Sequence, residues 1–107
     1  MNFIKTNTHN DFKVTTIGVR PEHITVAEGE GIWEGKIGVV EHLGSESFLH
    51  VTLNDGNGLT VKASGDTPLK YGDTVKLTVN DDKVFFFDEA GLNVSSAVSS
   101  LNQILVG

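Results

Sequence analysis

Residues 48–63 read FLHVTLNDGNGLTVKA, which is the pattern of a β-hairpin. Apolar and polar residues alternate on both sides of the centre, as they do when one face of each strand is buried. The centre, Asn54-Asp55-Gly56-Asn57-Gly58, supplies residues that tolerate the positive φ angles of a tight hairpin turn. The stretch therefore predicts two antiparallel strands whose Leu49, Val51 and Leu53 side chains face a core.

Similar short segments lie on both sides of this hairpin. Strands are predicted at residues 14–19, 24–26, 32–43, 74–79 and 84–87. Residues 1–12 are predicted to form a connecting arm or an edge segment. Gly35 and Gly38 predict a bulge or a sharp bend in the strand that contains them. Many short strands with few helices predict an all-β fold, a small OB-like barrel of roughly five to seven strands, which we favour over a sandwich.

The end of the chain has a different period. Val94, Val98, Leu101 and Leu105 recur at helical spacing, and Ser95 or Ser96 could cap the helix. A strand over residues 103–106 is the competing interpretation. The predicted organisation is therefore a barrel domain over residues 1–94 and a C-terminal tail over 95–107, helical and packed on the barrel or on a neighbouring subunit.

The composition excludes several classes of function. The chain has 107 residues, no cysteine and a formal net charge of −6, from 8 basic and 14 acidic residues. The lack of cysteine excludes disulfides and thiolate metal sites. The acidic balance argues against nucleic-acid partners and anionic membrane surfaces, since nucleic-acid affinity depends largely on Lys and Arg at phosphates.

No catalytic constellation is visible in the sequence. Residues 31–36, Gly-Ile-Trp-Glu-Gly-Lys, resemble a phosphate-binding loop, but Ile37 stands where that loop needs Ser or Thr, and the stretch leads into a predicted strand. His42 and His50 could face each other across a hairpin, although exposed strand histidines are the favoured interpretation. We therefore predict no catalytic, cofactor-binding or metal-binding residue in this chain.

The aromatic residues at 84–87 and Trp33 indicate which side chains face the core and which face a surface or an interface. Val84 and Phe86 alternate with Phe85 and Phe87, so one pair is expected in the core and the other on a surface that contacts protein. Trp33 is expected in the core or at an interface.

The pentapeptide Arg20-Pro21-Glu22-His23-Ile24 predicts the end of a strand followed by a helical turn. Proline cannot donate to a strand ladder and suits the first position of a helical turn, where an acidic residue is also favoured. An Arg–Glu pair that pins this turn is the favoured role, and docking of a partner is the alternative. The predicted structural or partner-contact residues are Arg20, Glu22 and His23, with Glu41, Gly44 and Glu46 as further candidates for an exposed loop contact.

The motifs, taken in order from Met1 to Val94, resemble the transport-associated OB (TOBE) domain. They are Met-Asn-Phe-Ile at 1–4, Gly-Val-Arg-Pro-Glu-His-Ile at 18–24, Val-Glu-His-Leu-Gly at 40–44, Gly-Asp-Thr-Val at 72–75 and Phe-Phe-Asp at 86–88. This domain is the C-terminal regulatory part of the ATP-binding subunits of sugar-import ABC transporters of the maltose and glycerol-phosphate type. The chain departs from the family pattern in a shorter stretch over residues 5–17 and in the tail after Ser95.

The resemblance implies a regulatory and dimerisation domain without its own chemistry. ATP and Mg would bind only in an ATPase domain outside this sequence. The chain is therefore expected to be a fragment of a transporter ATPase, with a free-standing relative of the domain as the alternative. The implied partners are a second copy of the ATPase subunit as a homodimer, membrane-spanning permease subunits and a regulatory protein, at the cytoplasmic side of the cell membrane. The alternative is a small-ligand module for a sugar or an oxyanion, with backbone amides around Gly44 and Ser45 as its site. A single-strand nucleic-acid binder is a third and weaker possibility.

Overall fold

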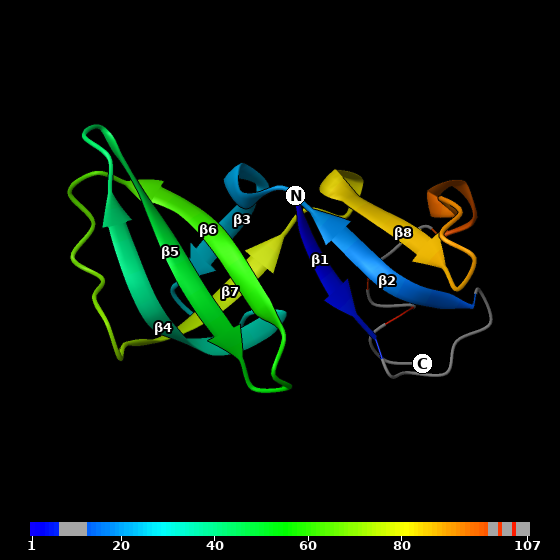
Figure 1. Ribbon diagram of the computed structural model, residues 1–107, viewed down its shortest axis with the longest axis horizontal. Helices are drawn as coiled ribbons and strands as arrows, with labels where there is room; N and C mark the ends of the chain where they lie inside the picture. The colour runs from blue at the N-terminus through cyan, green and yellow to red at the C-terminus, as the bar shows by residue number, and fades with distance from the viewer. Residues whose placement is uncertain (7–12, 99–100, 102–103, 105–107) are drawn as a thin grey trace. The chain divides into compact units, whose positions relative to one another are not determined.

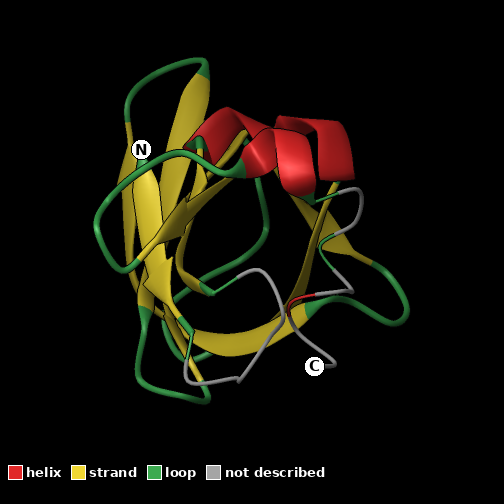
Figure 2. Ribbon diagram, turned by 90° about the vertical axis from the view of Figure 1, so that its right-hand side faces the viewer, coloured by secondary structure: helices red, strands yellow, loops and turns green. Residues whose placement is uncertain are grey.

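Eight antiparallel strands form two separate sheets in the computed structural model, which describes residues 1–6, 13–98, 101 and 104 (Figure 1). One unit comprises Pro21–Val79, and the other is formed by Met1–Arg20 together with the segment from Asn80 onward. Strands and loops make up most of the described chain, and its helical turns are short (Figure 2). The predicted all-β class is confirmed.

The unit of residues 21–79 contains a five-stranded sheet in the order β3-β7-β4-β5-β6. These strands are β3 (Ile24–Ala27), β4 (Trp33–His42), β5 (Glu46–Leu53), β6 (Gly58–Ser64) and β7 (Thr74–Val79). Its edge strands β3 and β6 approach each other within 8 Å between Cα atoms. Their described residues form no hydrogen-bonded ladder, so the sheet does not close into a fully paired barrel.

The predicted hairpin is β5 and β6. Val51 pairs with Leu59, the Leu53 amide donates to the Asn57 carbonyl at 2.8 Å, and Gly56 has a φ of 94°. The positive φ explains the glycine in this turn. The alternation is also confirmed, because the side chains predicted on one face form the core of this unit. The buried apolar residues are Ile24, Trp33, Ile37, Leu49, Val51, Leu53, Leu59, Val61, Val75, Leu77 and Val79.

The long strand β4 has the irregularity that its glycines predict. Its register with β5 shifts between Ile37 and Val39, at Gly38. After the shift, Val39 pairs with His50 and His42 pairs with Ser47. The two histidines therefore do not face each other across the hairpin, because the turn is tighter than the sequence suggested and the register follows it.

The other unit contains a three-stranded sheet in the order β1-β2-β8. Its strands are β1 (Asn2–Lys5), β2 (Val14–Val19) and β8 (Val84–Asp88). Within the segment predicted as an arm or an edge, Asn2–Lys5 thus form an edge strand, and residues 7–12 lie outside the described residues. Val84 and Phe86 are buried while Phe85 and Phe87 are half-buried, so the two predicted faces of the aromatic run are confirmed. The extra edge strand takes the total to eight, above the predicted five to seven.

Three short 3₁₀ turns join or follow the strands: η1 (Pro21–His23), η2 (Asp81–Lys83) and η3 (Ser95–Ala97). The strand-ending turn predicted at Pro21 is confirmed by η1. Ser95 does not cap a helix; its hydroxyl accepts a hydrogen bond from the Phe86 amide at 2.9 Å. Among the described helical segments, none has the length and apolar character needed to cross a membrane.

The predicted helix is wrong at its start, because Ser95–Ala97 forms a short 3₁₀ turn and Val98 after it has an extended backbone. Most of the rest of the predicted helix lies outside the described residues, which include 95–98, 101 and 104 of the tail. Val98, Leu101 and Ile104 are all buried. The Leu101 amide donates to the Asp81 carboxylate at 2.9 Å, so this part of the tail is fixed to η2. The division of the chain at residue 94 stays a prediction.

Candidate functional site

A hollow in the five-stranded unit brings together two of the predicted contact residues, Glu22 and Glu46. We call it the carboxylate hollow; its volume is about 510 Å³, and η1, the β4–β5 turn, β5 and β6 contribute to its walls. It is lined by Glu22, Ser45, Glu46, Lys62, Ala63 and Ser64. Glu22 and Glu46, which are far apart in the sequence, therefore line one surface.

The β4–β5 turn is held against the end of β6 by backbone contacts. Gly44 has a φ of 84°, which favours glycine, and the Leu43 amide donates to the Glu46 carbonyl at 2.9 Å. The Gly65 amide donates to the Ser45 carbonyl at 3.0 Å. A side chain on Gly65 would have no room, since its Cβ would lie 2.1 Å from the Gly44 carbonyl oxygen. These glycines fix Ser45 and Glu46 at the rim of the hollow.

One ammonium group, that of Lys62, lines the hollow together with the two carboxylates. Lys62 Nζ lies 3.0 Å from Glu46 Oε2, a diagonal pair in the β5–β6 register, where Glu46 pairs with Ser64 and Phe48 with Lys62. The hydrogen bond and the attraction to Glu46 raise the pKa of Lys62; desolvation opposes this rise, and Glu22 adds a weaker upward effect. With two carboxylates and one ammonium, the hollow favours cationic groups of a partner over anions. This balance argues against an oxyanion site at Gly44 and Ser45.

A second cluster of polar side chains, Glu41, His50 and Thr60, lies on the outer face of β4, β5 and β6. His50 Nε2 contacts the Glu41 carboxylate, and His50 Nδ1 lies 3.4 Å from Thr60 Oγ1. The side chains of His50 and Glu41 are 41% and 52% exposed, so water competes for both groups. A carboxylate, an imidazole and a hydroxyl on an open strand face can hydrogen-bond a partner, but they lack the buried nucleophile environment of a catalytic triad. The described residues contain no group of three or more His, Cys, Asp or Glu that could hold a metal ion.

The six predicted contact residues occupy different places. Glu22 and Glu46 line the carboxylate hollow, and Gly44 forms the turn beside it. Glu41 lies on the same hairpin but contacts His50. His23 is half-buried in η1, and its Nδ1 has no hydrogen-bond partner among the described residues. Arg20 belongs to the other unit and is exposed. The roles of all six stay predictions.

Sequence reasoning missed Lys62 as the partner of Glu46. The signal was present, since Lys62 is a polar position of the predicted returning strand and a hairpin places diagonal neighbours within reach of long side chains. The missing information was the register, which only the turn geometry sets.

The comparisons agree with the sequence motifs. A family model for the TOBE domain matches residues 17–87. The uncharacterized ABC transporter ATP-binding protein YurJ of Bacillus subtilis is 41% identical over 76 residues, which cover 66% of this chain and 20% of that protein. An sn-glycerol-3-phosphate import ATP-binding protein of Agrobacterium fabrum is 34% identical over 86 residues, covering 76% and 24% of the two chains.

A third relative is the maltose/maltodextrin import ATP-binding protein of Aliivibrio fischeri, 33% identical over 78 residues that cover 71% of this chain and 21% of the relative. The aligned part of the chain thus spans a quarter or less of the length of these curated relatives. The recognition made from the motifs is confirmed: the chain belongs to the TOBE domain family found in ATP-binding proteins of sugar and glycerol-3-phosphate importers.

Proposed function

We propose that this chain is a non-catalytic regulatory and dimerisation domain of the ATP-binding subunit of an importer for sugars or related solutes. The observation that carries the proposal is the TOBE match over residues 17–87, together with relatives named as import ATP-binding proteins. The local fold supports the non-catalytic part, because the Gly31–Lys36 stretch runs into strand β4, whereas a phosphate-binding loop opens a helix.

The wider setting follows from the same membership. The proposed partners are a second copy of the ATP-binding subunit, the membrane-spanning permease subunits and a regulatory protein. The subunit would work on the cytoplasmic side of the cell membrane, with ATP and Mg bound by an ATPase domain and not by this chain. An OB-like barrel is the proposed form of the five-stranded unit, supported by the family and by the approach of β3 to β6.

The proposed mechanism is a surface contact whose strength differs between two states of the ATPase dimer. A domain can shift such an equilibrium only through differential binding to the two states. The carboxylate hollow supplies a chemistry for this contact, because Glu22 and Glu46 together would attract a basic side chain of a partner. Lys62 would then exchange its pairing between Glu46 and the solvent as the partner binds.

Sedimentation velocity over a concentration series tests the dimerisation. The expected result is self-association that weakens in the double variant Glu22→Gln/Glu46→Gln and persists in Glu34→Gln, which changes an exposed glutamate on β4. A chain that stays monomeric at the highest concentration would contradict dimerisation by this domain alone. Phosphate release from ATP by the purified chain would contradict the non-catalytic role.

Arg20→Ala separates the two roles considered for that residue. A lower melting temperature with unchanged self-association indicates that Arg20 stabilises its turn. An unchanged melt with lost self-association indicates that it contacts a partner.

A further inference from the structure

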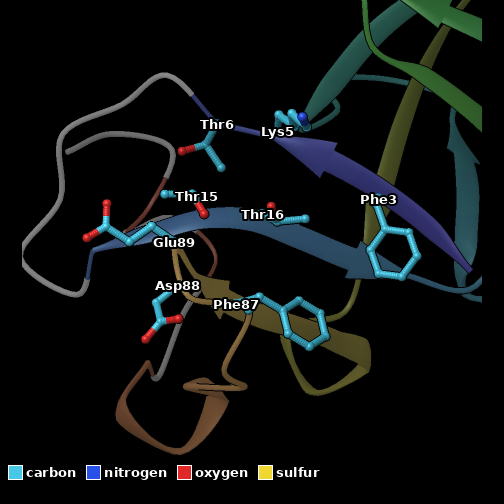
Figure 3. Close-up of a pocket in the computed structure, with 9 residues that line it drawn as sticks. Phe3, Lys5, Thr6, Thr15, Thr16, Phe87, Asp88 and Glu89 are labelled. Carbon is cyan, nitrogen blue, oxygen red and sulfur yellow. The ribbon is translucent and has the colours of Figure 1, made fainter.

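A second hollow, independent of the proposed regulatory role, lies on the three-stranded unit (Figure 3). We call it the ring hollow; its volume is about 650 Å³, within the usual range of small-ligand sites. Its lining combines rings, hydroxyls and charges: Phe3, Lys5, Thr6, Thr15, Thr16, Phe87, Asp88, Glu89 and Gly91.

Two aromatic rings form one end of the ring hollow. The rings of Phe3 and Phe87 pack edge to face, with centroids 6.2 Å apart and planes at 60°. Gly18 lies beneath them, where a Cβ would be 3.1 Å from the Phe87 ring and 2.8 Å from the sulfur of Met1. The glycine therefore lets the rings lie close to the sheet. Phe3 remains 58% exposed, so part of its ring is open to a ligand.

A β-bulge gathers hydroxyl groups at the other end. The register of β2 with β8 shifts between Val14 and Thr16, which pair with Asp88 and Phe87. Side chains of consecutive strand residues normally point to opposite faces, but a bulge can turn both to one side. Thr15 and Thr16 accordingly both line the hollow, and Figure 3 shows them between the Phe87 ring and the Glu89 carboxylate. The Thr6 amide donates to the Thr15 carbonyl at 2.9 Å and holds the bulged residue in place.

The charges of the ring hollow do not favour a simple ion. Asp88 Oδ1 accepts hydrogen bonds from the Ala90 and Leu92 amides, both at 3.0 Å, and is committed to its own turn. Lys5 and Glu89 bring one charge of each sign to the lining. Because Asp88 is held by its own turn, the Lys5 ammonium and the Glu89 carboxylate are the charges that a ligand would meet, and they oppose each other. A neutral ligand that both donates and accepts hydrogen bonds suits this set of groups.

We propose that the ring hollow binds a neutral sugar. Its apolar C–H face would lie on the exposed Phe3 and Phe87 rings, and its hydroxyl groups would hydrogen-bond Thr15, Thr16 and Glu89. The chemistry follows from a ring platform next to hydroxyls and a carboxylate, a combination that matches the two kinds of surface on a pyranose. This location differs from the Gly44–Ser45 region, where the small-ligand alternative had been placed.

The test is an NMR titration of the ¹⁵N-labelled 107-residue chain with maltose and, separately, with glycerol 3-phosphate. Maltose at up to about 50 mM, suited to a millimolar Kd, should shift the amides of Thr15, Thr16, Gly18 and Phe87. Glycerol 3-phosphate should leave these amides in place. If maltose shifts nothing there, or if glycerol 3-phosphate shifts them more strongly than maltose, the proposal is wrong.

Variants separate a real site from a weak surface contact. Thr16→Val keeps the side-chain shape and removes one hydrogen bond, so the affinity should fall about threefold to tenfold. Thr25→Val is the matched control, an exposed threonine on β3 of the other unit, and should leave the affinity unchanged. Phe3→Leu on the exposed edge strand should also weaken binding, and it tests the ring platform even if a Phe87 variant fails to fold. Unchanged affinity in both Thr16→Val and Phe3→Leu would overturn the proposal.

Discussion

Gly65 lies so close to Gly44 that a Cβ on Gly65 would be 2.1 Å from the Gly44 carbonyl oxygen. The same close approach brings the Gly65 amide to 3.0 Å from the Ser45 carbonyl. The end of β6 and the β4–β5 turn thus meet through backbone alone. This contact places Ser45 and Glu46 at the rim of the carboxylate hollow.

Gly65→Ala should therefore destabilise the chain by about 1–3 kcal/mol, the usual cost of forcing an extra group into a filled space. Relief would require movement of the turn, because the clashing atom belongs to the backbone. Urea denaturation measures the loss. Gly29→Ala is the control, since no atom lies within 4 Å of its added Cβ and its φ is not in the left-handed region. An equal effect of the two substitutions would mean that the 44–65 contact is absent in solution.

The Lys62–Glu46 pair predicts a dependence of stability on pH. Contact with Glu46 raises the pKa of Lys62 above its ordinary value of 10.5 in the folded state. A raised folded-state pKa stabilises the fold fully below the unfolded pKa, and this contribution disappears as pH rises through the folded pKa. Lys62→Met should lower the urea midpoint slightly at neutral pH, and the difference from the parent chain should vanish above the lysine range.

Salt gives an independent check of the same pair. The Lys62 and Glu46 side chains are 45% and 40% exposed, so water and ions reach both. Added NaCl should therefore shrink the difference in urea midpoint between Lys62→Met and the parent chain at neutral pH. Lys36→Met, on an exposed position of β4, serves as the control. If the urea midpoints of Lys62→Met and the parent chain still differed at alkaline pH, Lys62 would act through packing of its aliphatic stem instead of its charge.

The buried hydroxyl of Ser47 is expected to stabilise the fold through a hydrogen bond. Its side chain is fully buried, and its hydroxyl lies 2.9 Å from Nδ1 of the exposed His42 across the β4–β5 pair. Ser47→Ala should cost about 0.5–1.5 kcal/mol, the net value of one hydrogen bond, since the His42 ring can turn to water. Ser45→Ala, exposed in the neighbouring turn, should be close to neutral.

A double-mutant cycle isolates the Ser47–His42 contact. The combined loss in Ser47→Ala/His42→Ala should be smaller than the sum of the single losses, because both substitutions remove the same hydrogen bond. Strictly additive losses would indicate that the two side chains are independent.

The local elements followed from the sequence where side-chain period and turn chemistry agree. The 48–63 hairpin, the strand at 14–19 and the turn at Pro21 were all predictable, because alternation and glycine or proline chemistry act over a few residues. For the edge strand β1 the sequence predicts only an arm or an edge segment, since Ile4 alone of its side chains is buried and one buried position gives no period.

The contacts between side chains of the candidate site depend on the register of the paired strands, which cannot be predicted from the order of apolar and polar residues. A shift by one position at Gly38 decides that His42 faces Ser47 and that His50 reaches Glu41. The separation of the strands into two sheets is likewise set by pairings between distant segments, such as β2 with β8. Family motifs identified the domain correctly, but they could not predict that Lys62 would line the same hollow as Glu22 and Glu46.

The burial of Leu101 indicates that this part of the tail packs in the core. Its side chain is 1% exposed, and its amide donates to Asp81 Oδ1 at 2.9 Å. Leu101→Ala should cost about 2–5 kcal/mol, as for other buried leucines. Leu92→Ala, at a position 64% exposed, should have little effect. Asp81→Ala should lower stability as well, because it leaves the Leu101 amide without its acceptor. If Leu101→Ala unfolds at the same urea concentration as the parent chain, the Leu101 side chain does not pack in the core in solution.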